Sequence, residues 1–169
     1  KDAFSKFYKH KIKLNFIKTD NKQIDIPDEI IEEILRKAKN NKRVLVILNT
    51  VSFAQYVYEK LKDRADESLK HKIYLLHSRY TLKDREEKEA NYINHEFKNP
   101  KPKNEDIGKI LVATQVVEAS LDIDADVLYT EICPLDCLVQ RMGRILRRYF
   151  YRDNKIFNKE SNDKFNLDK

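Results

Sequence analysis

Glycine is nearly absent from this chain. The 169 residues include two glycines, Gly108 and Gly143. A Walker A loop, which wraps its backbone around nucleotide phosphates, needs two glycines separated by four residues, with lysine and then serine or threonine after the second. Neither glycine meets that requirement, so we expect no Walker A loop within this chain.

Cysteine and long apolar runs are also scarce. The two cysteines, Cys133 and Cys137, lie four positions apart, and the four histidines are scattered along the sequence. Because a structural zinc site needs four ligands that converge, we predict no metal site. We interpret the cysteines as reduced thiols in the core of a cytoplasmic protein. No signal peptide is visible, and no apolar run approaches the roughly 20 residues of a membrane-spanning helix.

Charge is abundant and slightly unbalanced. Lysine and arginine number 34 against 28 aspartates and glutamates, which gives a net charge of +6. Hydrophobic residues make up 41% of the chain, enough for the core of one domain. The positive excess is compatible with nucleic-acid binding. A lysine-rich solvated surface explains the same numbers, and charge alone favours that simpler interpretation.

Short apolar segments alternate with amphipathic segments along most of the chain. The sequence predicts strands over residues 12–16, 44–48, 72–76, 110–113 and 127–132, and helices over 28–40, 51–61 and 82–97. This alternation predicts an α/β fold with a mainly parallel sheet flanked by helices. We divide the chain into a lead-in strand and linker (1–26), a domain (27–148), and a polar tail or the start of a truncated module (149–169).

Polar residues follow three of the predicted strands. They are Asn49 and Thr50, then His77, Ser78 and Arg79, and then Thr114 and Gln115. Ligands of such sheets bind at the carboxyl ends of the strands, and hydroxyl, amide and arginine groups are suitable donors to phosphate oxygens. We therefore predict a track for a sugar–phosphate backbone along this edge. The alternative is that these residues only cap the helices that follow them.

The stretch from Lys109 to Arg148 combines a strand, a polar loop, a second strand and a predicted helix. The helix carries Gln140, Arg141, Gly143, Arg144 and Arg147. On one helix Arg144 and Arg147 would share a face, and Gln140 would lie one turn earlier. This pattern predicts a phosphate site, since arginines aimed at a γ-phosphoryl group stabilise the charge that forms during its transfer. The alternative is an exposed arginine-rich helix end that complements the helix dipole.

Two motifs in this stretch resemble those of the second RecA-like lobe of superfamily-two helicases. VATQ at residues 112–115, with LDID at 121–124, resembles motif V, and QRMGRILR at 140–147 resembles motif VI. More narrowly, NTV at 49–51, LHSRY at 76–80 and EASLDID at 118–124 are similar to the CRISPR-associated helicase-nuclease of type I interference systems. The resemblance covers about residues 40–148 and implies a RecA-like three-layer sandwich.

The resemblance also implies roles for individual residues. Arg147 would be the arginine finger and Arg144 a second γ-phosphate contact, while Arg141 would organise the loop of motif V. Gly143 would allow the helix to approach closely, Thr114 would contact nucleic-acid phosphate, and Glu118 would bond within the loop. The nucleotide-binding set would comprise Ser120, Asp122, Gln140, Arg141 and Gly143. Ser120 replaces the glycine of many relatives, in agreement with the CRISPR branch, whereas Leu146 departs from the small or polar residue often found at its position.

Walker A and the Asp-Glu box belong to the first lobe of such helicases, and this chain has neither. The resemblance therefore implies half of a motor, with ATP and Mg²⁺ bound only in a complete two-lobe enzyme and no cofactor held by this chain alone. The implied partners are a first RecA-like lobe, single-stranded DNA, a CRISPR surveillance complex and an HD-type nuclease domain, and no membrane. Two alternatives stay open: the lobe of another superfamily-two helicase acting on RNA or duplex DNA, and a nucleic-acid-binding module without motor activity.

Overall fold

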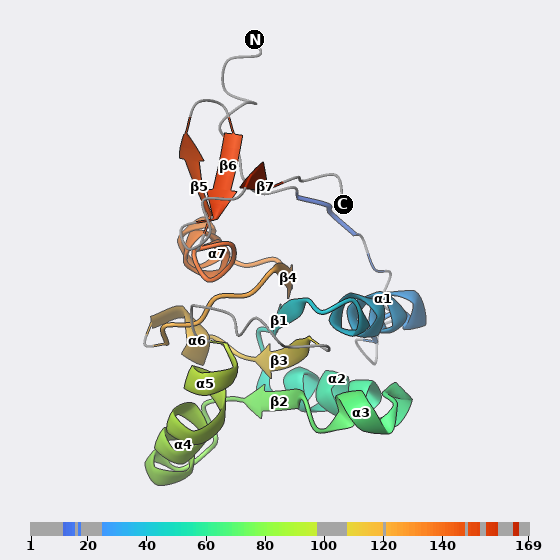
Figure 1. The fold of residues 1–169 in the computed structure, drawn as a ribbon. Coiled ribbons are helices and arrows are strands. Elements are labelled where there is room, and N and C mark those ends of the chain that lie inside the picture. Colours follow the sequence, from blue (N-terminus) through green and yellow to red (C-terminus); the bar gives the residue numbers. More distant parts are fainter. Residues whose placement is uncertain are drawn as a thin grey trace.

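Four parallel strands form the central sheet of the domain (Figure 1). The computed structural model describes residues 12–15, 17, 25–97, 108–119, 121–147, 149–152, 155–158 and 164–165. The strands are β1 (Arg43–Ile47), β2 (Ile73–Leu76), β3 (Lys109–Ala113) and β4 (Val127–Thr130), and they lie in the order β2-β3-β1-β4. The predicted α/β fold with a parallel sheet is confirmed.

The two central strands are buried along their whole length. Every residue of β1 and β3 is buried, whereas β2 and β4, at the edges, are partly exposed. Parallel strands with helices on both faces are apolar at successive positions rather than at alternate ones. After their first, charged residue, the runs RVLVI and KILVA meet that need, and their register places Val46 opposite Val112. For this reason the sequence located both strands to within one residue.

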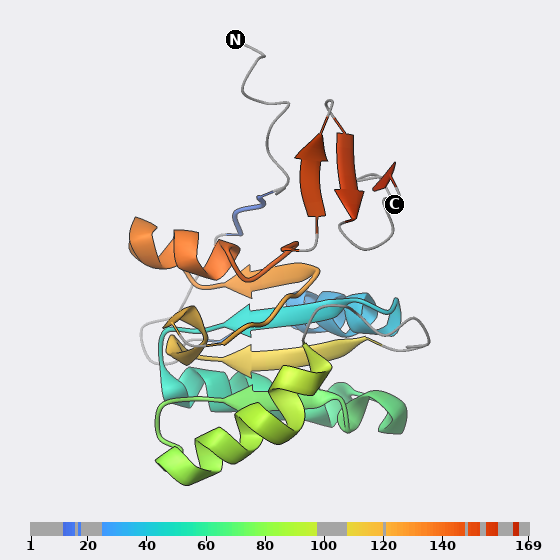
Figure 2. The ribbon, with the colours of Figure 1, turned by 60° about the vertical axis from the view of Figure 1, so that its left-hand side comes forward.

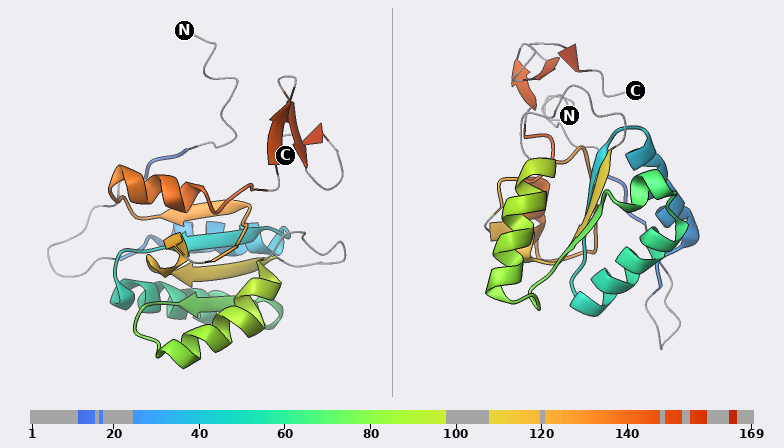
Figure 3. Two further views of the ribbon diagram at one scale, coloured as in Figure 1. Left: turned by 90° about the vertical axis from the view of Figure 1, so that its left-hand side faces the viewer. Right: turned by 60° about the horizontal axis from the view of Figure 1, so that its bottom comes forward.

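Helices cover both faces of the sheet, so the domain has three layers (Figure 3). On one face lie α1 (Asp28–Lys39), α2 (Val51–Arg64) and α3 (Glu67–Lys70); on the other lie α4 (Leu82–Lys88), the π-helical segment η2 (Glu89–Ile93), α5 (Asn94–Glu96) and α6 (Val116–Ala119). Successive strand residues face opposite layers. Val46 packs in one hydrophobic cluster with Ile34 of α1, and Ile47 packs in the other with Phe97. One sheet therefore separates two hydrophobic cores.

Threonine side chains cap the first turns of two helices. Thr50 Oγ1 accepts a hydrogen bond from the backbone N–H of Phe53 at 3.3 Å, and Thr81 Oγ1 accepts one from the N–H of Asp84 at 3.2 Å. The Thr81 hydroxyl also donates to the Asp84 carboxylate at 2.7 Å. These bonds satisfy backbone donors that have no partner inside their own helix. They fix the starts of α2 and α4, close to the carboxyl ends of β1 and β2.

α7 (Leu135–Met142) follows β4 (Figure 2). It contacts α6. Beyond it the chain forms three antiparallel strands, β5 (Tyr149–Arg152), β6 (Lys155–Asn158) and β7 (Lys164–Phe165), which pair in that order. These strands lie in residues 149–169, for which the sequence analysis offered two possibilities, a polar tail or the start of a truncated module. The segment contains a small antiparallel sheet. In the part of the chain that the structure describes, every helix is too short or too polar to span a bilayer.

The lead-in strand predicted over residues 12–16 does not form among the residues described there. Residues 12–15 and 17 lie outside any strand, and Ile12 and Leu14 are 70% and 71% exposed. Alternating polar and apolar residues give a segment one apolar face, but a strand also needs a neighbouring backbone that accepts and donates its hydrogen bonds. Between α5 and β3, Pro100 and Pro102 favour an exposed loop, but residues 98–107 fall outside the described part of the chain.

Candidate nucleotide and nucleic-acid interface

Polar residues gather where the four parallel strands end. Just beyond the strands, in chain order, stand Asn49, His77, Thr114 and Glu131. Parallel strands end at one edge of their sheet, so the three predicted polar clusters share that edge. A direct bond joins two of them, since Gln115 Nε2 donates to the backbone carbonyl of Asn49 at 3.0 Å.

Arg141 lies buried at this edge, with 1% of the residue exposed. Its Nε donates to Glu118 Oε1 at 2.7 Å, its Nη1 to Thr130 Oγ1 at 2.7 Å, and its Nη2 to Asn49 Oδ1 at 3.0 Å. Nη1 also donates to the carbonyl oxygen of Glu131 at 3.3 Å. We call these five residues the Arg141 network. A guanidinium away from water needs such partners, because an uncompensated buried charge is very costly.

The Arg141 network agrees with the organising role that the resemblance implies for Arg141. It connects α7 to Glu118 in α6, within the loop of motif V (residues 114–124). The three guanidinium nitrogens all donate to protein groups. Direct contact between Arg141 and a nucleotide stays a prediction, and it would require this buried side chain to become accessible.

Arg144 and Arg147 do not lie on one helix with Gln140, so that prediction is wrong. α7 ends at Met142, and the two arginines occupy the turns beyond it. Gly143 caps the helix, with its N–H bonded to the carbonyl of the residue four positions earlier. A Cβ at Gly143 would meet carbonyl oxygens of the preceding turn, the nearest at 3.2 Å. The closest atoms to Gly143 thus belong to its own helix and not to a neighbouring element.

A long-range pairing explains why the helix stops. Ile145 forms a parallel bridge with Ala125, and the neighbouring backbone bonds run from Ala125 N–H to Arg144 C=O at 3.0 Å and from Leu146 N–H to Ala125 C=O at 2.9 Å. Leu146 adopts a left-handed conformation with φ of 54°, which a right-handed helix cannot include. The segment after α7 thus pairs with the chain before β4.

The side chain of Arg144 binds the backbone of the motif V loop. Its Nη1 donates to the carbonyl oxygen of Leu121 at 2.6 Å, and its Nη2 to that of Glu118 at 2.5 Å. Burial lowers the pKa of the Arg144 guanidinium, and the positive charge of Arg147 lowers this pKa further. Arg144 stays charged despite this shift, because the ordinary pKa of arginine lies far above neutral pH. Two charge-assisted bonds therefore fix the backbone of the loop, in addition to the bond between Arg141 and the Glu118 side chain.

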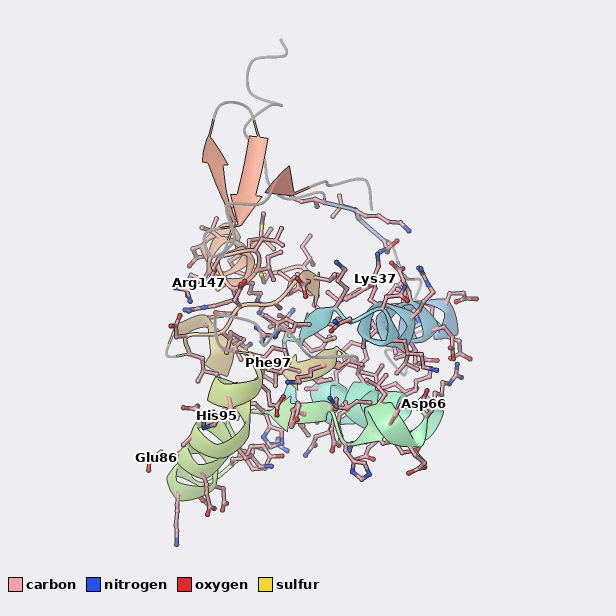
Figure 4. All side chains as sticks on the ribbon, viewed as in Figure 1. Lys37, Asp66, Glu86, His95, Phe97 and Arg147 are labelled. Atoms are coloured by element: carbon pink, nitrogen blue, oxygen red, sulfur yellow. The ribbon has the colours of Figure 1, made fainter. Side chains whose placement is uncertain are left out.

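Arg147 differs from the two preceding arginines because it faces solvent. Its side chain is 41% exposed and extends at the margin of the molecule (Figure 4). Its Nη1 forms an ion pair with Asp122, whose side chain is 84% exposed. Its backbone N–H donates to Oδ1 of the buried Asp124 at 2.9 Å. The main chain of Arg147 is thus held firmly, while its guanidinium is accessible to a ligand.

His77 is buried, with 4% of the residue exposed. Its ring stacks on Tyr80, with centroids 4.2 Å apart and planes 2° from parallel, and its Nε2 lies 3.4 Å from Gln55 Nε2. Burial lowers the pKa of His77, and the charges of Arg79 and Lys88 lower it further. The neutral ring is therefore the form that the folded domain favours near neutral pH.

The burial of His77 predicts a loss of stability in mild acid. The pKa of His77 is lower in the folded domain than in the unfolded chain, so the unfolded chain takes up the proton first as the pH falls. The contribution of neutral His77 to the free energy of unfolding is complete above about pH 6.5 and is lost progressively below that value. Urea unfolding at several pH values should show this slope in the wild type and less of it in His77→Gln. His71→Gln, at an exposed histidine after α3, should keep the wild-type slope; equal slopes in all three proteins would contradict the assignment.

The remaining predicted residues divide into exposed and enclosed groups. Thr50, Ser78, Arg79, Gln115, Asp122 and Gln140 are exposed. Thr114 is 1% exposed, and its hydroxyl has no hydrogen-bond partner among the described residues; Ser120 lies outside the described residues. Contacts of all these residues with a ligand stay predictions, and the one for Thr114 would require its side chain to become accessible.

The sequence interpretation missed two members of the Arg141 network, Thr130 and Glu131. Both stand at the carboxyl end of β4. The polar residues predicted as site residues stand at the same position after the other three strands. Applying the same positional rule to the fourth strand would have found them. The described residues contain no group of three histidine, cysteine, aspartate or glutamate side chains placed to hold a metal ion.

Comparisons with known proteins point to a single family. A family model described as CRISPR-associated nuclease/helicase Cas3, C-terminal, matches residues 40–149. The chain is 43% identical over 125 residues to the CRISPR-associated endonuclease/helicase Cas3 of Escherichia coli (strain K12), an alignment that covers 73% of this chain and 14% of the relative. It is 34% identical over 152 residues to the CRISPR-associated nuclease/helicase Cas3 of Streptococcus thermophilus, covering 86% of this chain and 15% of that protein.

Solved structures resemble the fold as well. The crystal structure of T. fusca Cas3-ATP matches with a TM-score of 0.67 and 32% sequence identity, over 76% of this chain and 15% of that chain. A chain of a CRISPR RNA-guided surveillance complex, described as pre-nicking, matches with a TM-score of 0.57 and 30% identity, over 73% of this chain and 15% of that chain. The present chain thus spans a small part, 14% to 15%, of these relatives.

Proposed function

The chain belongs to the family of CRISPR-associated nuclease/helicase Cas3 C-terminal domains, and from this premise we propose that it is the second motor lobe of an ATP-dependent single-stranded-DNA helicase. In this proposal a first RecA-like lobe, outside the present sequence, holds ATP. The second lobe closes on that nucleotide and presents Arg147 to its γ-phosphate. Opening and closing of the two lobes would then move the DNA strand along the shared edge of the sheet.

The observation that carries the proposal is the exposed ion pair of Arg147 and Asp122. A carboxylate and a phosphate oxygen are interchangeable partners for a guanidinium, so a phosphate can take the place of Asp122. The backbone N–H of Arg147 is bonded to Asp124, so the position from which the side chain extends is fixed. Arg144 is less suited to the same role, because both its terminal nitrogens already bind carbonyl oxygens. We assign it to holding the motif V loop.

The complete enzyme would bind ATP with Mg²⁺, which supplies the phosphoryl group whose cleavage drives the motor. Arg147 fits this ligand, because an exposed arginine beside the site of cleavage stabilises the charge that develops there. The ATP-containing structure of T. fusca Cas3 supports the use of this nucleotide. The surveillance complex among the similar structures supports such a complex as a partner, and an HD-type nuclease domain is the other partner we propose.

The nucleic-acid track would run past the exposed residues at the strand ends. Thr50 follows β1, and Ser78 and Arg79 follow β2, which places hydroxyl groups and a positive charge on the same edge of the sheet. Such groups bind phosphates without reading sequence. A single strand can follow this edge because its flexible backbone adapts to a row of separate donors.

The test is ATPase stimulation of the full-length protein by different nucleic acids. We expect single-stranded DNA to stimulate turnover more strongly than single-stranded RNA or duplex DNA at the same nucleotide concentration. Stronger stimulation by RNA or duplex would support the lobe of another superfamily-two helicase instead. Nucleic-acid binding with no ATPase activity under any condition would favour a binding module without motor activity.

A further inference from the structure

Every polar atom of Asn49 has at least one partner within the protein. Its side-chain Oδ1 accepts from Arg141 Nη2 at 3.0 Å, and its Nδ2 donates to the carbonyl oxygen of Ile132 at 3.0 Å. Its backbone N–H donates to Glu131 Oε2 at 2.5 Å, and its backbone carbonyl accepts from Gln115 Nε2 at 3.0 Å. The bonds of Oδ1 to Arg141 and of Nδ2 to Ile132 fix the orientation of the amide group, although the second N–H of Nδ2 is not used in them. The bonding of Asn49 points to a role other than the predicted nucleic-acid contact.

The partners of Asn49 follow the two strands that flank β1, or lie on α7. Asn49 itself follows β1, Gln115 follows β3, Glu131 and Ile132 follow β4, and Arg141 lies on α7. These bonds span between 66 and 92 positions of sequence. One residue therefore sets the spacing of two strand ends and of the helix that carries Arg141.

The bonds continue from Asn49 to the segment that carries the proposed arginine finger. Arg141 binds the side chain of Glu118, and the backbone carbonyl of the same Glu118 accepts from Arg144. Arg144 lies three positions before Arg147, whose side chain pairs with Asp122 in the same loop. In the other direction, the exposed Thr50 is the next residue after Asn49.

We propose that Asn49 is a positioning residue that holds Arg141, and through it the motif V loop and Arg147, in the geometry needed for ATP hydrolysis. This inference rests on the proposed function. It replaces the nucleic-acid contact predicted for Asn49 from the sequence. Nucleic acid contacts the neighbouring Thr50, and Asn49 connects that contact to the arginines.

The physical basis is the cost of leaving a buried guanidinium nitrogen without an acceptor. Loss of the Asn49 amide removes one of the three side-chain acceptors of Arg141, and a hydrogen bond to a charged group is stronger than one between neutral groups. Arg141 then shifts toward another acceptor and carries Glu118 with it. Displacements of about 1 Å are enough to reduce catalysis by roughly a hundredfold when they reach the reacting groups.

The experiment compares Asn49→Ala, Asn49→Asp and Thr50→Ala in the full-length protein, with ATPase rates measured against single-stranded DNA concentration. For Asn49→Ala we expect the maximal rate to fall about tenfold, with the DNA concentration for half-stimulation unchanged. Asn49→Asp keeps an acceptor for Arg141 and should recover most of the maximal rate. Thr50→Ala should instead raise the half-stimulating concentration several-fold.

Three outcomes would overturn the proposal. A higher half-stimulating concentration for Asn49→Ala, with an unchanged maximal rate, would make Asn49 a nucleic-acid ligand. An unchanged curve would remove any role in the reaction. Equal losses for Asn49→Ala and Asn49→Asp, together with equal losses in melting temperature, would show a structural role alone. The proposed function fails by a different result, because it requires ATPase activity in the wild type that depends on Arg147.

Discussion

Replacing Arg147 by alanine in the full-length protein is expected to lower the ATPase rate stimulated by single-stranded DNA by about a thousandfold or more. The change removes the exposed guanidinium and leaves the buried contacts of the domain in place. Since the backbone N–H of residue 147 still donates to Asp124, the fold should persist. The loss should therefore fall on the maximal rate, while melting temperature and DNA binding stay close to those of the wild type.

Two further variants sharpen this result. Arg147→Lys keeps the positive charge but not the planar set of donors, so it should recover only part of the lost rate. Arg36→Ala removes an exposed arginine from α1, in the other helical layer, and should be indistinguishable from the wild type. Near-wild-type turnover of Arg147→Ala would refute the finger assignment and leave the family membership unaffected.

Replacing Arg141 by alanine is expected to produce the largest loss of stability in the domain, about 3–5 kcal/mol of the free energy of unfolding. The side chain of Glu118, which pairs with Arg141 and is 10% exposed, would keep a charge without its partner. Asn49 and Thr130 would each lose a donor in the same place. Urea or thermal unfolding of the chain measures this loss directly.

A double variant separates loss of the charge pair from loss of packing. Arg141→Met with Glu118→Leu removes both charges and fills much of the space with apolar groups, a change that is often tolerated at buried ion pairs. We expect the double variant to be clearly more stable than Arg141→Ala. Arg36→Ala again serves as the exposed control. If Arg141→Ala unfolded at the same denaturant concentration as this control, the Arg141 network would not contribute to the fold.

Local sequence patterns were enough to predict the layers of the domain. The apolar runs of β1 and β3 could only be strands covered on both faces, and the helical spacing of Ile31, Ile34, Leu35 and Ala38 gave α1 its buried face. The caps at Thr50 and Thr81 were equally predictable, because each bond spans three residues. These features depend on residues that are close together in the sequence, so local sequence patterns are enough to predict them. The family was predictable for a related reason, since its motifs are short and contiguous.

The contacts of each polar residue in the site depend on long-range packing and could not be predicted from local patterns. The pattern of residues 140–147 favours a helix, yet the bridge between Ile145 and Ala125 ends that helix and gives Arg144 and Arg147 different surroundings. The lead-in segment shows the reverse case, in which a strand pattern forms no strand among the described residues 12–15 and 17. The bond between Asn49 and Arg141 joins residues 92 positions apart. No local pattern encodes such a contact. The two residues come together only where the ends of the parallel strands meet, and the strand ends meet only once the sheet has formed.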